Sequence, residues 1–199
     1  AVALAAALQA DVCEIYTDVD GVFTADPRFV KNAYKLDDIS YDEMLELASL
    51  GANVLHNRSV EMAKKYNVKM AVKSSLSNDI GTYVKEVDQV EKMLVRGVTR
   101  DNDCARIALC GVEDTPGKAF KIFALLSKHN IGVDLIIQSI GNGKTKDITF
   151  TVAEGDLEKV MEIFEENKEI VKAEEIKYKK DVSKVSIVGC GMVSNAGVA

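Results

Sequence analysis

Residues 106–126, RIALCGVEDTPGKAFKIFALL, carry the pattern of a strand, a tight turn and a helix in direct succession. The apolar run of residues 106–112 predicts the strand, and the Asp, Pro and Gly of residues 113–117 predict the turn. A helix is expected over residues 118–129, because apolar side chains return there at helical spacing. We expect this helix to bury six side chains: Ala119, Phe120, Ile122, Phe123, Leu125 and Leu126.

The residues that follow complete a ferredoxin-like unit. Strands are predicted at residues 133–139, at residues 148–152, where polar and apolar positions alternate, and at residues 174–178. The resulting order is β-α-β-β-α-β. The second helix is expected to begin at Asp156 as its cap and to turn inward Leu157, Val160, Met161, Ile163 and Phe164. At helical spacing, four large side chains are interpreted as core residues: Phe120, Phe123, Met161 and Phe164.

The pattern of the first strand recurs 78 residues later, where residues 184–189, KVSIVG, repeat residues 106–111, RIALCG. Gly197 falls two residues later than the position that corresponds to Gly117. A repeated supersecondary unit predicts tandem domains, and we assign the first to residues 95–178 and the start of a second to residues 182–199. Gly189 and Gly191 resemble part of a dinucleotide fingerprint, but the third glycine is missing and the repeat explains their position.

The first part of the chain, residues 1–84, alternates helix and strand signals. A strand is predicted at residues 12–16, and Ser40 and Glu43 form a capping box that begins a helix. A second helix over residues 59–66 and a strand over residues 68–72 follow. This alternation predicts an α/β fold with a largely parallel sheet covered by helices. The polar residues 78–103 mark the boundary to the ferredoxin-like unit.

Composition excludes several classes of partner. The net charge of −6 lacks the basic surface of a nucleic-acid-binding protein. No apolar run approaches the roughly 20 residues that span a membrane. The cysteines form no CxxC pair and no metal spacing with either histidine. Three of them lie in apolar runs, so we interpret them as reduced core residues of a cytoplasmic protein without a metal site.

Both ends of the sequence have the character of a cut. The first eight residues are rich in Ala and Leu and lack an initiating Met, a cap or the charge pattern of a signal peptide. The last residues, 191–199, run from a strand signal into the start of a helix. We therefore expect the chain to be a piece of a longer protein.

A loop after the first predicted strand has the residue types of a nucleotide site. Residues 17–28, TDVDGVFTADPR, combine hydroxyl groups, three carboxylates, a glycine turn and one arginine at the end of a strand, where open α/β sheets bind ligands. Arg28 could bind a phosphate and an Asp could bind a metal ion. By composition alone such a loop is more often only a turn. Asp18, Asp20 and Gly21 lack the further acidic positions of a calcium loop.

The same loop resembles the nucleotide-binding segment of the aspartokinases, written T-D-V-D-G-V-[YF]-T-x-D-P-R in that family. Residues 1–8, 40–48 and 51–56 also resemble that family, so the likeness covers the whole chain. It implies that residues 1–84 are the C-terminal part of an amino-acid kinase α/β sandwich. It also implies contacts to ATP from Thr17, Asp18, Phe23, Thr24, Asp26 and Arg28, with Asn53 and Val54 from a later segment. The catalytic Lys and Asp of the family lie outside this sequence, so we expect the chain alone to be inactive.

Three residues depart from the family pattern or invite a catalytic interpretation. Asn53 stands where the family usually has Lys near the ATP phosphates, so its contribution should be weaker. Asn57 stands where Pro is common, a change that we interpret as structural. His56 could be taken for a general base, but phosphoryl transfer depends mainly on positioning and charge neutralisation. We therefore expect His56 to pack or to cap a helix.

The turn at residues 114–118, DTPGK, is the second candidate site. Gly117 at a helix start allows close approach to free N–H groups, which suit a carboxylate. By itself the motif is a good turn and helix cap. The unit resembles ACT domains, which bind amino acids at this loop. That likeness implies effector contacts from Asp114, Gly117, Lys118 and Ala119, and, on the strand expected opposite, from Asp134 and Gln138.

The resemblance implies an enzyme that uses ATP and Mg²⁺ to phosphorylate the β-carboxylate of L-aspartate to 4-phospho-L-aspartate, the first step toward lysine, threonine and methionine. Lysine or threonine would regulate it through paired ACT domains in a homodimer or higher oligomer. An alternative is a separately made regulatory subunit, which would have no use for the 17–28 loop. A further alternative adds a homoserine dehydrogenase beyond residue 199.

Overall fold

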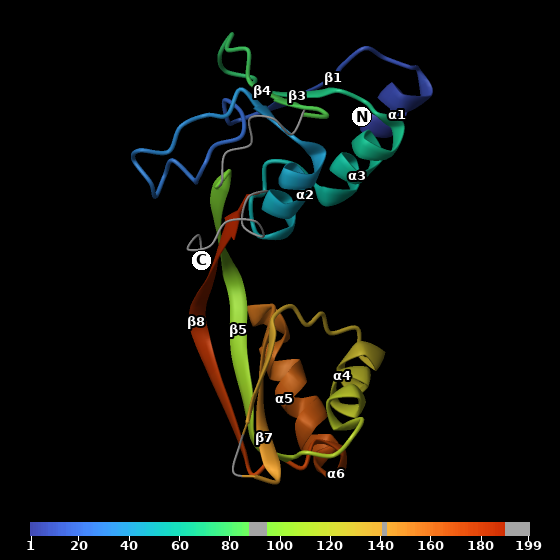
Figure 1. Cartoon of the computed structure of the whole chain (residues 1–199), viewed down its shortest axis with the longest axis vertical. Helices are drawn as coiled ribbons and strands as arrows, with labels where there is room; N and C mark the ends of the chain where they lie inside the picture. The colour runs from blue at the N-terminus through green and yellow to red at the C-terminus, as the bar shows by residue number, and fades with distance from the viewer. Residues whose placement is uncertain (88–94, 141–142, 190–199) are drawn as a thin grey trace. The chain divides into compact units, whose positions relative to one another are not determined.

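The computed structural model describes residues 1–87, 95–140 and 143–189, and it divides the chain into two compact units (Figure 1). The first unit comprises residues 1–101 and the segment from Val185 onward, and the second comprises residues 102–184. Within the described residues, no helix is long and apolar enough to cross a membrane.

The first unit is a mixed sheet with helices packed on it. Its elements are α1 (Val2–Ala7), β1 (Cys13–Thr17), β2 (Asp38–Ile39), α2 (Tyr41–Ser49), α3 (Asn57–Tyr66), β3 (Met70–Ser74) and β4 (Thr82–Val84), and its strand order is β1-β3-β4-β2. The pairs β1–β3 and β2–β4 are parallel, whereas β3–β4 is antiparallel. The prediction of a largely parallel sheet thus missed β4, because three residues in a polar segment carry too little hydrophobic pattern.

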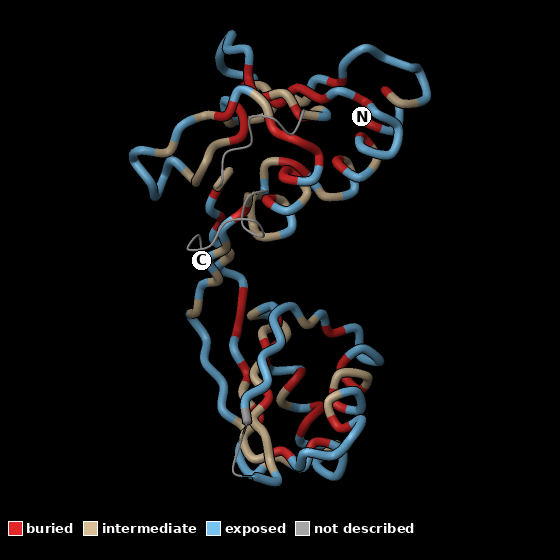
Figure 2. Tube along the Cα trace, in the orientation of Figure 1, coloured by how far each residue is buried: buried red, intermediate tan, exposed pale blue. Residues whose placement is uncertain are grey.

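Helices α2 and α3 lie on one face of this sheet and bury their apolar sides against it (Figures 1 and 2). The predicted capping box of α2 is present: the Ser40 side chain accepts from the Glu43 N–H, and the Glu43 carboxylate accepts from the Ser40 N–H. His56 caps α3, where its Nδ1 accepts from the Arg58 N–H at 3.2 Å. The core between sheet and helices includes the fully buried Ile39, Met44, Val60, Met70 and Val72.

The second unit has the predicted ferredoxin-like fold. Strand β5 (Gly97–Glu113) is followed by α4 (Lys118–Lys128), β6 (Ile136–Ile140), β7 (Thr145–Val152), a 3-10 turn (Glu154–Asp156), α5 (Leu157–Glu166), α6 (Lys168–Val171) and β8 (Glu175–Val188). The sheet order is β6-β7-β5-β8, which places the first and third strands of the β-α-β-β-α-β plan at the centre. Strand β7 pairs antiparallel with both β5 and β6.

The core of the second unit is built around Phe150 of β7. Its ring meets the ring of Phe123 edge to face at 5.5 Å and the ring of Phe164 at 6.2 Å. Such T-shaped pairs add to the free energy of burial. Leu109 and Ile122, from β5 and α4, are buried in the same cluster.

Two predictions for this unit were wrong in detail, those for Phe120 and for the side chain of Asp156. Phe120 is 76% exposed. Lys118 and Ile122 lie on the face of α4 that is buried against the core, and Phe120 lies about 200° around the helix from Lys118, so it points away from the core. Met161, Ala119 and Phe123 do pack against the core as predicted, although each is only partly buried. Asp156 occupies the cap position of α5 but makes no side-chain cap hydrogen bond, since it belongs to the preceding 3-10 turn.

The two long strands also exceed their predictions. Strand β5 begins at Gly97 rather than Arg106, and β8 continues to Val188 rather than ending at Tyr178. The repeat motif of residues 184–189 therefore starts inside β8. The rest of the predicted second copy, residues 190–199, lies outside the described residues, as does Cys190. Cys13 and Cys104 are buried, Cys110 is half-buried, and none of these three forms a disulfide.

Candidate functional site

The 17–28 loop leaves β1 at its C-terminal end, next to the end of the parallel strand β3. The Thr17 carbonyl accepts from the Ser75 N–H at 2.7 Å and from the Ser75 hydroxyl at 3.0 Å. The Thr17 hydroxyl donates to the Asp18 carboxylate at 3.0 Å, and the Ser77 hydroxyl donates to Asp20 at 3.0 Å. The segment after β3 thus holds the first half of the loop.

A buried threonine from β4 holds the middle of the loop. The Thr82 hydroxyl donates to the Leu36 carbonyl at 2.6 Å and accepts from the Val22 N–H at 2.9 Å. Gly21 has a φ of +143°, and a Cβ there would lie 2.5 Å from the Thr82 Oγ1. Only glycine fits this close approach. The sequence held no signal for Thr82, since its partners are more than forty residues away in the chain.

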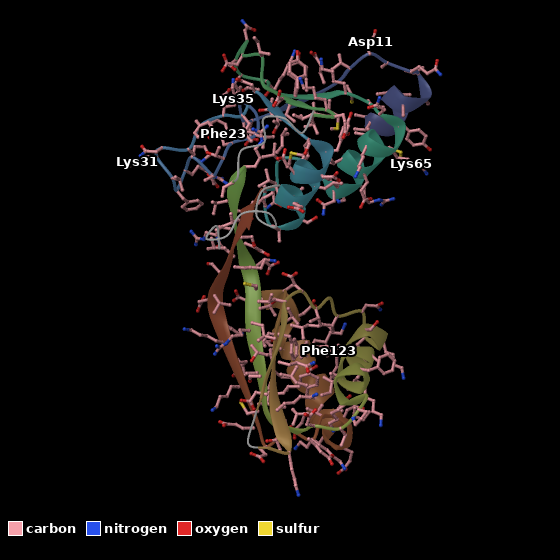
Figure 3. The ribbon with its side chains drawn as sticks, viewed as in Figure 1. Asp11, Phe23, Lys31, Lys35, Lys65 and Phe123 are labelled. Atoms are coloured by element: carbon pink, nitrogen blue, oxygen red, sulfur yellow. The ribbon has the colours of Figure 1, made fainter. Side chains whose placement is uncertain are left out.

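The second half of the loop folds back as a short antiparallel pair. Phe23 bridges to Lys35, and the two residues lie side by side (Figure 3). The Thr24 N–H donates to the Tyr34 carbonyl at 3.0 Å, and the Tyr34 N–H donates to the Thr24 hydroxyl at 3.2 Å. This pairing sets the path of the turn that carries Asp26 and Arg28.

Asp26 and Arg28 form a two-pronged ion pair on that turn. The Arg28 guanidinium donates from Nη2 to Asp26 Oδ2 at 2.7 Å and from Nε to Asp26 Oδ1 at 3.0 Å. The hydrogen bond from Arg28 lowers the pKa of Asp26 below its ordinary value. The Arg28 side chain is 82% exposed. It is therefore an oriented cation open to solvent, which suits recognition of a phosphate.

Two residues predicted at the same site come from the segment after α2. Asn53 is exposed, whereas Val54 is partly buried against the core of the first unit. The turn before them lies close to β5, because a Cβ on Gly51 would be 2.9 Å from the Arg100 carbonyl oxygen. The predicted residues thus fall into one well-defined loop and one separate segment.

A small pocket beside the 17–28 loop is lined by residues that were not predicted as site residues from the sequence. Its volume is about 320 Å³, and the Lys35 Nζ lies 3.2 Å from Asp79 Oδ2 at its wall. None of the eight predicted nucleotide residues lines it. The lining residues are Lys35, Asp37, Asp79, Ile80, Gly81 and Tyr83.

The 114–119 loop of the second unit has the predicted form of a helix start. Gly117 has a φ of +82° and caps α4 without a side-chain hydrogen bond, and a Cβ added to it would meet nothing within 4 Å. Lys146 lies 2.6 Å from the Asp114 carboxylate. Lys118 is buried, and burial lowers the pKa of its amine. Ala119 is partly buried against the core.

Asp134 does not lie opposite this loop within one unit, so that expectation was wrong. The Asp134 N–H donates to the Thr151 carbonyl, whereas Glu113 pairs with Thr145. Those two β7 residues are six positions apart, or about 20 Å along a strand. Strands β5 and β6 both run antiparallel to β7, so they are parallel to each other. The segment that leads into β6 therefore lies at the end of the sheet opposite to the one where β5 finishes and the 114–119 loop begins. Asp134 pairs there with Lys184, and Gln138 is exposed in the middle of β6 beside Ile148.

Comparison with known families divides the chain in a similar place. A sequence model of the amino acid kinase family matches residues 1–74, and a model of the ACT domain matches residues 107–167. Aspartokinase 2 of Bacillus subtilis is 50% identical over 200 residues, which cover 100% of this chain and 49% of that protein. The chain thus spans about half the length of the curated relatives it matches.

Solved structures agree with the sequence comparison. The E. coli aspartokinase III complex with aspartate and ADP aligns with a TM-score of 0.81 at 26% identity, over 100% of this chain and 44% of that one. The same enzyme in complex with lysine and aspartate aligns with a TM-score of 0.73 at 26% identity, over 95% of this chain and 42% of that one. With the 17–28 loop at the end of β1 and a ferredoxin-like unit later in the sequence, the chain belongs to the aspartokinase family.

Proposed function

We propose that this chain is the nucleotide-binding side and the regulatory module of an enzyme that phosphorylates L-aspartate. ATP would transfer its γ-phosphoryl group to the β-carboxylate and form 4-phospho-L-aspartate, the entry to lysine, threonine and methionine synthesis. The observation that carries the proposal is the exposed, oriented Arg28 in the 17–28 loop of a chain that is similar to aspartokinases throughout. We assign residues 1–84 to the kinase domain, residues 95–178 to a first ACT domain and residues 182–199 to the start of a second.

The loop suits a nucleotide for physical reasons. Thr17 and Asp18 stand at the carboxyl end of β1, where open sheets bind ligands. Phe23 and Thr24 would contact the base and ribose, and Arg28 would neutralise phosphate oxygens. Among the described residues, no group of three His, Cys, Asp or Glu side chains could hold a metal ion. Mg²⁺ would arrive with ATP, held by the phosphates, water and one or two carboxylates, as is usual for this ion.

The test uses a complete aspartokinase that carries this chain, since the family's catalytic Lys and Asp lie outside it. We expect ADP release that depends on L-aspartate, with aspartyl phosphate trapped as its hydroxamate. The 199-residue chain assayed alone should form no hydroxamate above background. ATP turnover by the complete enzyme that is indifferent to aspartate would reject the proposal.

We also propose that lysine or threonine binds to the second unit and favours a dimer. The E. coli enzyme that aligns with this chain was solved with lysine, which supports an amino acid as the effector. Within one unit, the 114–119 loop and Asp134 are too far apart for one amino acid to touch both. A ligand would contact the loop (Asp114, Gly117, Lys118, Ala119) of one ACT unit together with Asp134 and Gln138 of a neighbouring unit. Such a ligand adds contacts only in the paired state and shifts the population toward it.

Replacing Asp134 by alanine should weaken inhibition by the effector about fivefold, or about 1 kcal/mol. The effect is moderate because Asp134 already pairs with Lys184, an interaction that the effector's ammonium group would have to replace. Inhibition curves and calorimetry with lysine and threonine measure it, and Asp156→Ala is the control, since Asp156 makes no cap hydrogen bond. If Asp134→Ala and Gln138→Ala both respond like the parent, the effector binds elsewhere.

A further inference from the structure

The start of β5 is anchored to the core of the first unit through Arg96. Its side chain is 12% exposed, and Nη2 donates to the Asp38 carbonyl at 2.6 Å and to the Asp38 carboxylate at 3.1 Å. Nε lies 3.5 Å from the Glu43 carboxylate, which is itself engaged in the capping box of α2. The Arg96 N–H donates to the Val188 carbonyl at 2.7 Å. The anchor therefore joins β2, α2 and the end of β8.

The residues after this anchor touch the 17–28 loop directly. The Val98 N–H donates to the Thr24 carbonyl at 2.8 Å. Gly97 lies so close that a Cβ there would be 3.2 Å from the Thr24 oxygen and 3.0 Å from a methyl of Leu47. Neither the hydrogen bond nor the tight approach is visible in the sequence, since Thr24 and Val98 are more than seventy residues apart.

A third contact reaches the residue next to Arg28. The Arg100 guanidinium lies 4.9 Å from the centre of the Phe29 ring, within the range of a cation–π interaction. The Phe29 N–H donates to the Asp26 carbonyl at 3.0 Å, so Phe29 closes the turn on which Asp26 and Arg28 are paired. Immobilising the Phe29 ring therefore restricts the backbone that presents the Arg28 guanidinium.

We propose that residues 96–100, here called the brace, are a positioning element for the nucleotide. Through its contacts with Thr24 and Phe29, the brace restricts residues 24–29, so that the Arg28 guanidinium is held in place before ATP binds. Preorganisation of this kind increases affinity because less conformational freedom is lost on binding. The inference rests on the proposed function and adds to it residues that touch the loop rather than ATP. It gives the start of β5 a role in ATP affinity, although residues 96–100 lie outside both the amino acid kinase match and the ACT-domain match.

The decisive variant is Arg100→Gln in a complete aspartokinase that carries this chain. We expect KM and Kd for ATP to rise about two- to fivefold, the loss expected for an exposed cation–π contact. The KM for aspartate and the melting temperature should stay unchanged. Phe29→Leu should have the same effect, and the double variant should be no worse than either single one, because both remove one interaction. Arg100→Lys keeps a cation over the ring and should restore most of the ATP affinity.

Arg106→Gln is the matched control, since Arg106 is an exposed arginine on the same strand. Gly97→Val should raise Kd for ATP more than tenfold, since its side chain would displace the Thr24 backbone. If that variant fails to fold, the Arg100 variants decide.

The brace is rejected if Arg100→Gln binds ATP like the parent, or if KM for ATP and for aspartate rise together. Kd values for ATP measured by calorimetry distinguish a failure of the brace proposal from a failure of the proposed function. A parent that binds ATP but does not phosphorylate aspartate contradicts the proposed function and leaves the brace testable, whereas a parent that does not bind ATP contradicts both.

Discussion

Replacing Arg28 by alanine in the complete enzyme should raise KM for ATP about 10- to 150-fold and leave KM for aspartate nearly unchanged. The range corresponds to the 1.5–3 kcal/mol typical of a hydrogen bond to a charged group, roughly tenfold for each 1.4 kcal/mol. Arg28 is highly exposed, and Asp26 orients it by accepting hydrogen bonds from its Nε and Nη2. A phosphate can therefore reach the guanidinium without a rearrangement of the loop.

Lys31→Ala is the control for Arg28, because Lys31 is an exposed cation three residues further along the same segment (Figure 3). If ATP were attracted only by the net positive charge of this segment, Arg28→Ala and Lys31→Ala would weaken ATP binding equally. A smaller loss is expected for Asp26→Asn, which keeps the turn but weakens the orientation of Arg28. An unchanged dependence of Arg28→Ala on ATP concentration would show that the loop does not bind the phosphates.

Replacing Phe150 by alanine should reduce the free energy of unfolding of the second unit by about 3–5 kcal/mol, the usual cost of removing a core phenylalanine. The side chain is almost completely buried and makes edge-to-face contacts with Phe123 and Phe164. A cavity at the centre of so small a core cannot be filled by its neighbours without strain. Urea unfolding followed by circular dichroism measures the change.

Phe120→Ala is the matched control, because Phe120 has the same side chain but faces away from the core of its unit. Its effect on the free energy of unfolding should stay within about 0.5 kcal/mol, as for ordinary surface positions. Equal losses for the two variants would contradict the assignment of the core. Helical spacing alone predicts that both Phe120 and Phe123 face the core, whereas only Phe123 packs against it.

Local chemistry explains why much of the fold could be predicted. The Ser40 capping box, the strand at residues 106–112 and the turn before Gly117 depend on neighbours within a few residues, and such signals are readable from sequence. The helix that contains Phe120 was predicted correctly, but its six apolar residues occupy more of the circumference than the sheet covers. Which of them lie inside depends on the rotation of the helix against the strands, a property of the packed unit.

By itself, the sequence determined the family through the 17–28 loop, the order of elements in the second unit and the capping box of α2 in the first unit, because each is a local pattern. Only the tertiary structure decided that Thr82 holds the middle of that loop and that Arg100 lies over Phe29. It also decided that Asp134 lies at the far end of the sheet from Gly117. These relations join segments tens of residues apart, and each depends on strand register and direction, which many sequences with the same local pattern could satisfy differently.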